Sequence, residues 1–345
     1  MKKIFLLTAL AVLLGVATAT AQQISAVTES GETTIYQTLQ AAIEGASDGS
    51  VIYLPGGGFT ISDDVKITKR LTIIGIGHKS NNDNVDGTTT ISGNLWFNEG
   101  SSGSGVMGCY ITGNVNIGEG DASVNNVMVK CCNLNSINVL NNNCLSTFVN
   151  QNYIRSNSNF NGAPGSITNN IMHSVKFVTG GSISHNIFLG QGNYIPSAQS
   201  QRPYYACVRA DYSYINNNIM TPYIYSVDAY YVSQCAQYRL CEGSYNNVIN
   251  NITKKDNIGE ECINLNDIDW NDYFKNYNGG SISTNSNFHT KDTYVQYENT
   301  HGVYGGTGFN DKQIAPVPYI SAKHIDQETD ASGKLSIKIR VKAGE

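Results

Sequence analysis

The stretch "SITNNIMHSVKFVTGGSISHNIF", residues 166–188, contains nearly the same five residues twice. Ile-Thr-Asn-Asn-Ile begins at Ile167, and Ile-Ser-His-Asn-Ile begins at Ile183, 16 positions later. Both copies consist of an aliphatic residue, two spacers, Asn and a second apolar residue. A chain that repeats a short motif at such a distance is expected to repeat one structural unit.

The motif recurs along most of the chain. Successive Asn positions are 15 to 20 residues apart, except for two gaps of 32 and 33 residues, about twice the short period. A period of this length indicates a solenoid, in which stacked units bury an apolar face that one unit cannot bury alone. The fuller matches place Asn at positions 94, 114, 152, 170, 186, 218 and 251, and weaker matches lie at Asn133, Asn266 and Asn285.

The composition of the repeat selects the kind of solenoid. Leu is not the repeating residue, which excludes a leucine-rich horseshoe, and units this short and rich in Asn, Gly and Ser do not suit helical repeats. Asn tolerates left-handed backbone, and its amide can bond to the Asn one coil above. The sequence therefore predicts an all-β, parallel β-solenoid with one Asn ladder at a single edge, and with left-handed backbone at the ladder Asn.

The N-terminal sequence supports this fold. "TIYQTLQAAIEGASDGSVIYLPGGGFTISDDVKITKRLTIIGIG", residues 34–77, contains an amphipathic helix with Leu39, Ala42 and Ile43 on its apolar stripe, ended by Gly45, followed by short β-rich runs. It resembles the N-terminal cap and first coils of the pectate-lyase-like superfamily, and through the coil pattern the resemblance covers residues 33–285. It implies a single-stranded, right-handed parallel β-helix with an N-terminal capping helix; many members of that superfamily have no assigned enzymatic role.

The two ends of the chain suggest domain boundaries. Lys2 and Lys3, an apolar run and the small residues of Ala19-Thr20-Ala21 predict a signal peptide over 1–21. The protein is then expected to be secreted, periplasmic or on the outer cell surface, and no later apolar run reaches the roughly 18 residues of a membrane span. The β-helix with its cap is expected over 22–300, and 301–345 is expected to be a C-terminal Gly-rich loop followed by a β-strand segment.

The last 30 residues predict a β-hairpin or strand. Leu335, Ile337, Ile339 and Val341 alternate with basic and polar residues, and the turn before them would pair this strand with one around 320–325. This ending resembles the terminal segments of exported bacterial β-helix proteins. Two interpretations stay open: a cap over the open edge of the last coil, or a strand for surface attachment or sorting.

Cysteine usage does not suggest a disulfide framework, because the chain is long enough to bury a core. Cys109, Cys131, Cys132 and Cys144 lie in apolar text and are expected to pack as small hydrophobic residues. Cys235 and Cys241 are the expected disulfide.

Motifs for catalysis are missing from the coils. The net charge of −5 gives no reason to expect a nucleic-acid partner. Within the superfamily that the chain resembles, a pectate lyase needs clustered acids to hold calcium. A polygalacturonase-like hydrolase needs several Asp on neighbouring coils, with a nearby His and an Arg-x-Lys, and the coils of this chain show neither pattern. Asp63-Asp64 reads as a turn instead. No cofactor is expected, although Ca²⁺ remains possible at a charged patch.

Position relative to the ladder predicts such a patch. Asp211 and Asp228 stand seven residues before their corners, and Arg209 and Glu242 stand nine before theirs, if Cys235 occupies a ladder position. Offsets of seven and nine share one face of a strand. Arg209, Asp211, Asp228 and Glu242 are therefore candidates for cation or sugar-acid binding, or for catalysis if the protein is an enzyme. The alternative is a solvated face with partial charge pairing.

The text around this patch is rich in tyrosine. Tyr rings stack on sugar rings and their hydroxyls bond to sugar hydroxyls, but outward Tyr side chains also pack against loops. The candidate ligand-binding residues are Tyr194, Tyr204, Tyr205, Tyr212, Tyr230 and Tyr231.

Three functions remain open at this point. The first is a non-catalytic exported β-helix that binds a polysaccharide, a cell-surface glycan or another surface partner through its Tyr-rich side. The second is a polysaccharide lyase or glycoside hydrolase that acts on an extended polysaccharide. The third is a purely structural or adhesive surface protein.

Overall fold

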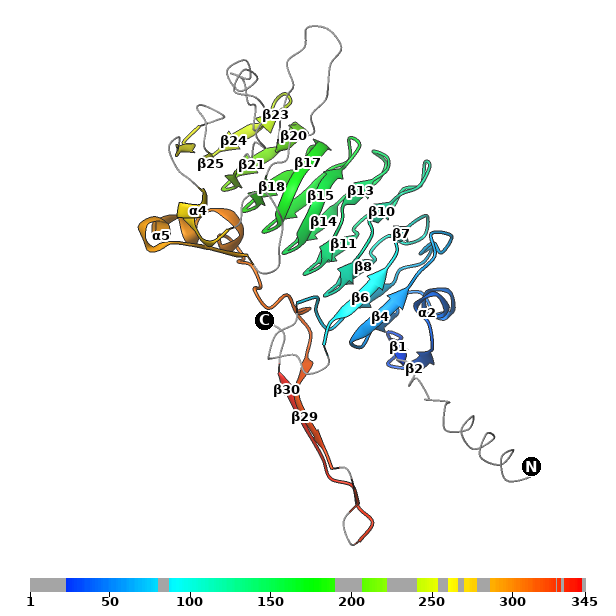
Figure 1. Cartoon of the computed structure of the whole chain (residues 1–345). Coiled ribbons are helices and arrows are strands. Elements are labelled where there is room, and N and C mark those ends of the chain that lie inside the picture. The colour runs from blue at the N-terminus through cyan, green and yellow to red at the C-terminus, as the bar shows by residue number, and fades with distance from the viewer. Residues whose placement is uncertain are drawn as a thin grey trace, which may run out of the picture.

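The computed structural model describes residues 23–79, 87–189, 207–221, 241–253, 260–265, 270–277, 286–326, 328–329 and 332–342. The expected signal peptide, 1–21, lies outside these residues. The described chain is mainly β, and Figure 1 shows its strands stacked in chain order, from blue near the N-terminus to yellow. Two long sheets contain most of the strands.

The first sheet has 11 strands, and from β3 onward all neighbours pair in parallel. Each strand pairs with the one that the chain forms on its next passage, so that Val129 lies between Val106 and Val149. In spatial order the strands are β2 (Thr33–Tyr36), β1 (Ile24–Val27), β3 (Val51–Tyr53), β5 (Thr72–Ile74), β8 (Gly105–Met107), β11 (Met128–Lys130), β14 (Thr147–Asn150), β16 (Gly165–Thr168), β18 (Ser182–Ser184), β21 (Tyr214–Asn216) and β24 (Asn247–Ile249).

The second sheet has 15 strands in two branches that meet at the long strands β15 (Tyr153–Asn159) and β17 (Ile171–Thr179). One branch continues through β4 (Gly57–Thr60), β6 (Thr89–Ser92), β9 (Tyr110–Ile111), β12 (Asn133–Leu134), β19 (Ile187–Phe188), β22 (Ile219–Met220), β25 (Ile252–Thr253) and β26 (Ile263–Asn264). The other contains β7 (Leu95–Phe97), β10 (Val115–Ile117), β13 (Ile137–Val139), β20 (Val208–Asp211) and β23 (Cys241–Glu242). One passage of the chain through both sheets is called a level below.

The core lies between the sheets because the same strand position is aliphatic at every level. In the first sheet, one in-register row of Ile and Val side chains is almost completely buried. Parallel pairing in register places like side chains above one another, so each level buries the apolar face of the next. The row consists of Ile52, Ile73, Val106, Val129, Val149, Ile167, Ile183 and Ile215.

The predicted Asn ladder is confirmed at five levels. From the second member onward, each ladder side-chain oxygen accepts the backbone N–H and the side-chain amide of the ladder Asn one level earlier, at 2.9–3.0 Å. The amide also donates to a carbonyl of the earlier level, as Asn170 does to Val149 at 2.9 Å. All five side chains are 0% exposed, so the ladder satisfies polar groups that water cannot reach. Its members are Asn152, Asn170, Asn186, Asn218 and Asn251.

The prediction that Asn94 and Asn114 belong to the same edge is wrong. These two residues follow β6 and β9 at a different corner, where the Asn114 N–H donates to the Asn94 side chain at 2.7 Å. Asn133 pairs with both Tyr110 and Tyr153, and Tyr153 follows the ladder residue Asn152. The ladder positions on the levels of Tyr110 and Asn133 therefore belong to Cys109 and Cys132, the residues before them. The Cys132 N–H continues the ladder by donating to the Asn152 side chain at 2.9 Å.

The predicted position of the left-handed backbone is also wrong, by one residue. Positive φ falls on the residue before the ladder position, and the ladder residue itself turns inward. The preceding side chain therefore points away from the core. These outward residues, called the outer corner column, are Cys131 (φ 50), Gln151 (59), Asn169 (54), His185 (55), Asn217 (53) and Asn250 (53).

The N-terminal helix α2 (Leu39–Gly45) follows the sequence prediction closely. The Thr38 hydroxyl accepts the Ala41 N–H at 3.1 Å and thereby caps the first turn. Leu39, Ala42 and Ile43 are the buried residues of the helix.

The C-terminal residues pack across the outer surface of the second sheet. The outward row of β17, β19, β22 and β25 is aliphatic, and it forms a second apolar cluster with rings such as Tyr273, Phe274 and Phe309. The elements of this C-terminal module are α4 (Trp270–Tyr273), β27 (Phe274–Asn276), β28 (Asn287–Thr290), α5 (Val295–Glu298) and two 3-10 turns, Asp292–Tyr294 and Gly302–Tyr304.

Residues 301–315, called the strap, then run back along the side of the levels. The Gly302 N–H donates to the Asn217 carbonyl at 2.8 Å, and the Asn169 amide donates to the carbonyls of Val303 and Gly305 at 2.8 and 2.7 Å. The Gln151 amide reaches the Gly308 carbonyl at 2.8 Å. The strap therefore crosses one level after another on the outer corner column.

The predicted C-terminal hairpin is present. Strands β29 (Tyr319–Ile325) and β30 (Ile337–Lys342) pair antiparallel and extend away from the stacked strands (Figure 1). All six residues of β30 are exposed. The alternation of apolar and basic residues predicts a strand with one buried face, and this expectation is wrong because both faces of β30 are exposed.

The cysteine predictions have mixed outcomes. Cys109, Cys131, Cys132 and Cys144 are free and buried, as expected. Burial raises the pKa of the Cys132 thiol to about 12, so this side chain packs as a neutral group. Cys235 of the expected Cys235–Cys241 disulfide lies outside the described residues, and Cys241 is a free thiol whose sulfur lies 3.9 Å from that of Met220.

Candidate functional site

The predicted charged patch is partly assembled on β20 and β23. Arg209 is exposed, Ala210 is buried and Asp211 is half-buried, so Arg209 and Asp211 share the outward face of β20 as expected. Arg209 also pairs in register with Glu242 on the next level. Asp228 and the side chain of Glu242 lie outside the described part of the structure. Their contribution to the patch remains a prediction.

The contacts of Arg209 and Asp211 tie neighbouring levels together. The Arg209 guanidinium lies over the Phe177 ring, 4.5 Å from its centroid. The Asp211 carboxylate accepts the Ser244 N–H at 2.7 Å. This bond brings two backbones so close that a Cβ atom on Gly243 would lie 1.7 Å from the Ala210 carbonyl oxygen. At least one oxygen of Asp211 therefore has a structural role.

Two tyrosines at the adjacent corner present their rings to solvent. The rings of Tyr212 and Tyr245 stack with centroids 4.9 Å apart and planes 12° from parallel. Their exposed fractions are 61% and 79%, and Tyr214 beside them is also 61% exposed. Each ring uses one face for the other ring, and most of the remaining surface is open. We call Tyr212 and Tyr245 the tyrosine pair.

One tyrosine of this pair was predicted from the sequence. Tyr212 was predicted, whereas Tyr245 and Tyr214 were not. Spacing gives the missing signal, because Tyr212 and Tyr245 each stand six residues before a ladder Asn, Asn218 and Asn251. The other predicted ligand-binding residues, Tyr194, Tyr204, Tyr205, Tyr230 and Tyr231, lie outside the described residues.

The backbone of the tyrosine pair is unusual for aromatic residues. Both residues adopt left-handed backbone, with φ of 50° and 58°. They stand two residues before Tyr214 and Asn247, which are in register on neighbouring strands of the first sheet. At the equivalent corner, most levels have a residue with positive φ. At the earlier levels this corner holds residues that tolerate such backbone well or are small. The positive-φ residues of the corner are Gly49, Gly103, Asn126, Ser146, Gly180, Tyr212 and Tyr245.

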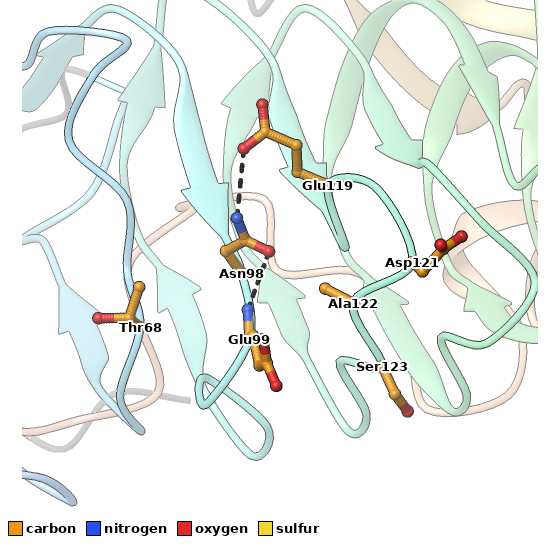
Figure 2. A pocket seen from close by; sticks show the side chains of 7 residues that line it. All are labelled: Thr68, Asn98, Glu99, Glu119, Asp121, Ala122 and Ser123. Carbon is orange, nitrogen blue, oxygen red and sulfur yellow. Dashed lines mark hydrogen bonds between the residues drawn. The ribbon is translucent and has the colours of Figure 1, made fainter.

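A hollow lies near the N-terminal end of the second branch, between the loops that follow β7 and β10. Its volume is about 800 Å³, and it is lined by Thr68, Asn98, Glu99, Glu119, Asp121, Ala122 and Ser123. Figure 2 shows the Asn98 side chain bonded to the Glu119 carboxylate at 3.2 Å and to the Glu99 N–H at 2.9 Å.

The carboxylates of this hollow do not form a joint site. Glu99, Glu119 and Asp121 point in different directions in Figure 2, and Glu119 also pairs with Lys66 at 3.5 Å. Among the described residues, no three His, Cys, Asp or Glu side chains are grouped as ligands for a metal ion. In the same residues no helix is long and apolar enough to cross a membrane.

Comparison with protein-family models, with curated proteins and with solved structures found no match to this chain.

Proposed function

We propose that this protein is an exported parallel β-helix that binds glycan through the tyrosine pair, without catalysis. The export part rests on the signal-like residues 1–21, and the β-helix part on the parallel sheets whose strands pair level by level. The glycan part is carried by one observation, two exposed and stacked tyrosines on left-handed backbone.

Stability gives little reason to place Tyr at these corners. Left-handed backbone costs an ordinary residue about 1–2 kcal/mol, and Gly or Asn, found at earlier levels of the same corner, avoid most of that cost. Stacking of the two rings returns about 0.5–1.5 kcal/mol. Because both tyrosines have left-handed backbone, the cost for the pair is about 2–4 kcal/mol, and the single stack returns only part of it. The ring surface itself is therefore the feature that favours Tyr212 and Tyr245.

Sugar is the ligand class that best suits this surface. The apolar face of a Tyr ring packs against the C–H face of a sugar ring, and the phenolic hydroxyl bonds to sugar hydroxyls. The corner is open and not an enclosed cavity, so it suits an exposed, extended saccharide more than a small buried ligand. Asp211, which was a candidate acid, is bonded to Ser244, and this favours binding over turnover.

A glycan array followed by calorimetric titration tests the proposal. The purified chain should bind at least one glycan, and the double variant Tyr212→Asn/Tyr245→Asn should bind it at least 10-fold more weakly. Asn suits left-handed backbone, so the variant should fold. Tyr53→Asn is the matched control, because Tyr53 is an exposed tyrosine (41%) on β3, far along the stack.

Two results would overturn the glycan proposal. One is a broad array on which the intact chain binds nothing. The other is a double variant that binds as tightly as the intact chain and melts at the same temperature.

A further inference from the structure

Three imidazole rings lie where the strap meets the levels. His301 belongs to the strap and places Nε2 3.2 Å from the Asn250 side-chain oxygen. His185 is in the outer corner column, and its ring packs against Gly305 and Gly306 so closely that a Cβ atom on either glycine would lie 2.5–3.1 Å from it. His78 meets the far end of the strap at Gln313. The strap is therefore held by histidines near both ends and between them.

The contacts of His78 determine which nitrogen of the neutral ring carries the hydrogen. Gln313 is fully buried, and its amide nitrogen donates to the Asn310 carbonyl, which leaves its side-chain oxygen to accept from His78 Nε2 at 2.9 Å. His78 Nδ1 is buried and has no partner within the described residues. Burial lowers the pKa of His78 to about 4, against the opposing hydrogen bond to Gln313. A proton on Nδ1 would be a buried charge without an acceptor.

Burial also disfavours a charge on His185 and His301. Burial lowers the pKa of His185 and of His301, and the charge of His185 lowers that of His301 further. The hydroxyl of Thr300 lies 2.8 Å from His301 Nδ1, and the Tyr297 ring meets the His301 ring edge to face. Protonating both rings would place two like charges near each other beneath the strap.

The charged groups that face the strap do not relieve this cost. Lys79 donates to the Asp311 carbonyl at 3.4 Å, and both Lys79 and Arg155 disfavour a charge on His78. The carboxylate of Asp311 is bonded to Tyr304 at 2.7 Å and to His289 Nε2 at 2.9 Å.

One further histidine behaves differently. The second nitrogen of His289 lies 2.7 Å from Glu298, so each nitrogen of this ring contacts a carboxylate, whereas His78 Nδ1 has no partner among the described residues. His289 therefore joins β28 of the C-terminal module to Asp311 of the strap, and this contact is separate from those between strap and levels.

We propose that the strap is a pH-sensitive clasp, held on the outer corner column while His78, His185 and His301 are neutral and released when they take up protons. Release breaks bonds such as Gly302 to Asn217 and Asn169 to Val303, and it exposes the amides of the outer corner column. The strap lies at a different edge from the tyrosine pair, and its release does not depend on glycan binding.

Hydrogen exchange of the intact chain, followed by mass spectrometry between pH 7.5 and 4.5 and corrected for intrinsic rates, tests the clasp. Peptides that cover 301–315 should lose at least 10-fold in protection on acidification, while peptides that cover β10 and β13 keep theirs. The clasp would be refuted by a strap that stays protected at pH 4.5, or by a strap and core that lose protection together.

A variant tests the role of the histidines. In His78→Gln/His185→Gln/His301→Gln the rings that titrate are gone, so a strap protected at pH 7.5 should remain protected at pH 4.5. His324→Gln is the control, because His324 is exposed on β29 and should not change the opening pH. Opening of the triple variant at the wild-type pH would disprove the mechanism.

A second measurement covers the case in which the triple variant does not dock its strap at pH 7.5. NMR titration of the wild-type imidazoles should show His78, His185 and His301 taking up protons over the pH range in which the strap opens. Protonation of these rings with the strap still protected would equally refute the clasp.

Discussion

The side-chain oxygen of Asn186 accepts two hydrogen bonds from Asn170, one from its backbone N–H at 2.9 Å and one from its side-chain amide at 3.0 Å. The oxygen of Asn170 does the same for Asn152 one level earlier. A single ladder residue thus serves two levels in a place that water does not reach.

Asn170→Leu should destabilise the protein by about 2–4 kcal/mol, because the backbone N–H and one side-chain amide hydrogen of Asn152 lose their acceptor at a buried corner. Urea denaturation measures the change. Lys338→Ala, at an exposed position of β30, should change the free energy of unfolding by less than about 0.5 kcal/mol. Equal shifts for the two variants would count against the ladder.

Two glycines with positive φ separate the backbone effect from the steric one. Gly180 (φ 70) has open space where a Cβ atom would lie, so Gly180→Ala should cost about 1 kcal/mol from left-handed backbone alone. Gly243→Ala adds a clash with the Ala210 carbonyl and should cost at least about 3 kcal/mol. Thermal melts compare the two, and similar losses would show that the close approach at Gly243 is not maintained.

Glycan binding through the tyrosine pair should depend weakly on salt. Stacking does not use net charge, so the affinity should change less than about twofold between 50 and 500 mM NaCl, whereas binding through Arg209 would be screened. Titration calorimetry at the two salt concentrations measures this. A tenfold loss at high salt would assign the affinity to the charged patch.

Stability should fall in acid because of His78. Its pKa is about 4 in the folded chain and 6.5 unfolded, so the unfolded state binds the proton first and stability is lost as pH falls from 6.5 to 4. The full loss from this group is about 3 kcal/mol. Urea denaturation at pH 7 and pH 4 should show a smaller difference for His78→Gln than for the wild type. An unchanged pH dependence in that variant would show that His78 does not contribute.

The sequence by itself determined the parallel stacking and the Asn ladder. Both follow from local chemistry repeated at a fixed distance: an aliphatic residue that must be buried and an amide that can bond above and below. The apolar stripe of α2 and the C-terminal hairpin were predictable for the same reason, since their periodicities lie within a few residues of sequence.

Only the tertiary structure decided which corner each motif occupies. The pattern around Asn94 and Asn114 matches that around Asn170, but a level has several corners with similar local demands, and the lengths of the intervening loops choose among them. Cys109 and Cys132 hold the ladder positions on two successive levels although no motif marks them. Tyr245 was not predicted for the same reason, because its role depends on stacking with Tyr212 one level away.

The strap could not be predicted from sequence at all. Its contacts join residues far apart in the sequence, in some cases by more than 130 positions, such as Asn169 with Val303 and His78 with Gln313. No local pattern encodes them, because they depend on the outward faces of completed levels. His78 becomes buried, with its Nε2 bonded to Gln313, only once the last part of the chain has folded back over the first.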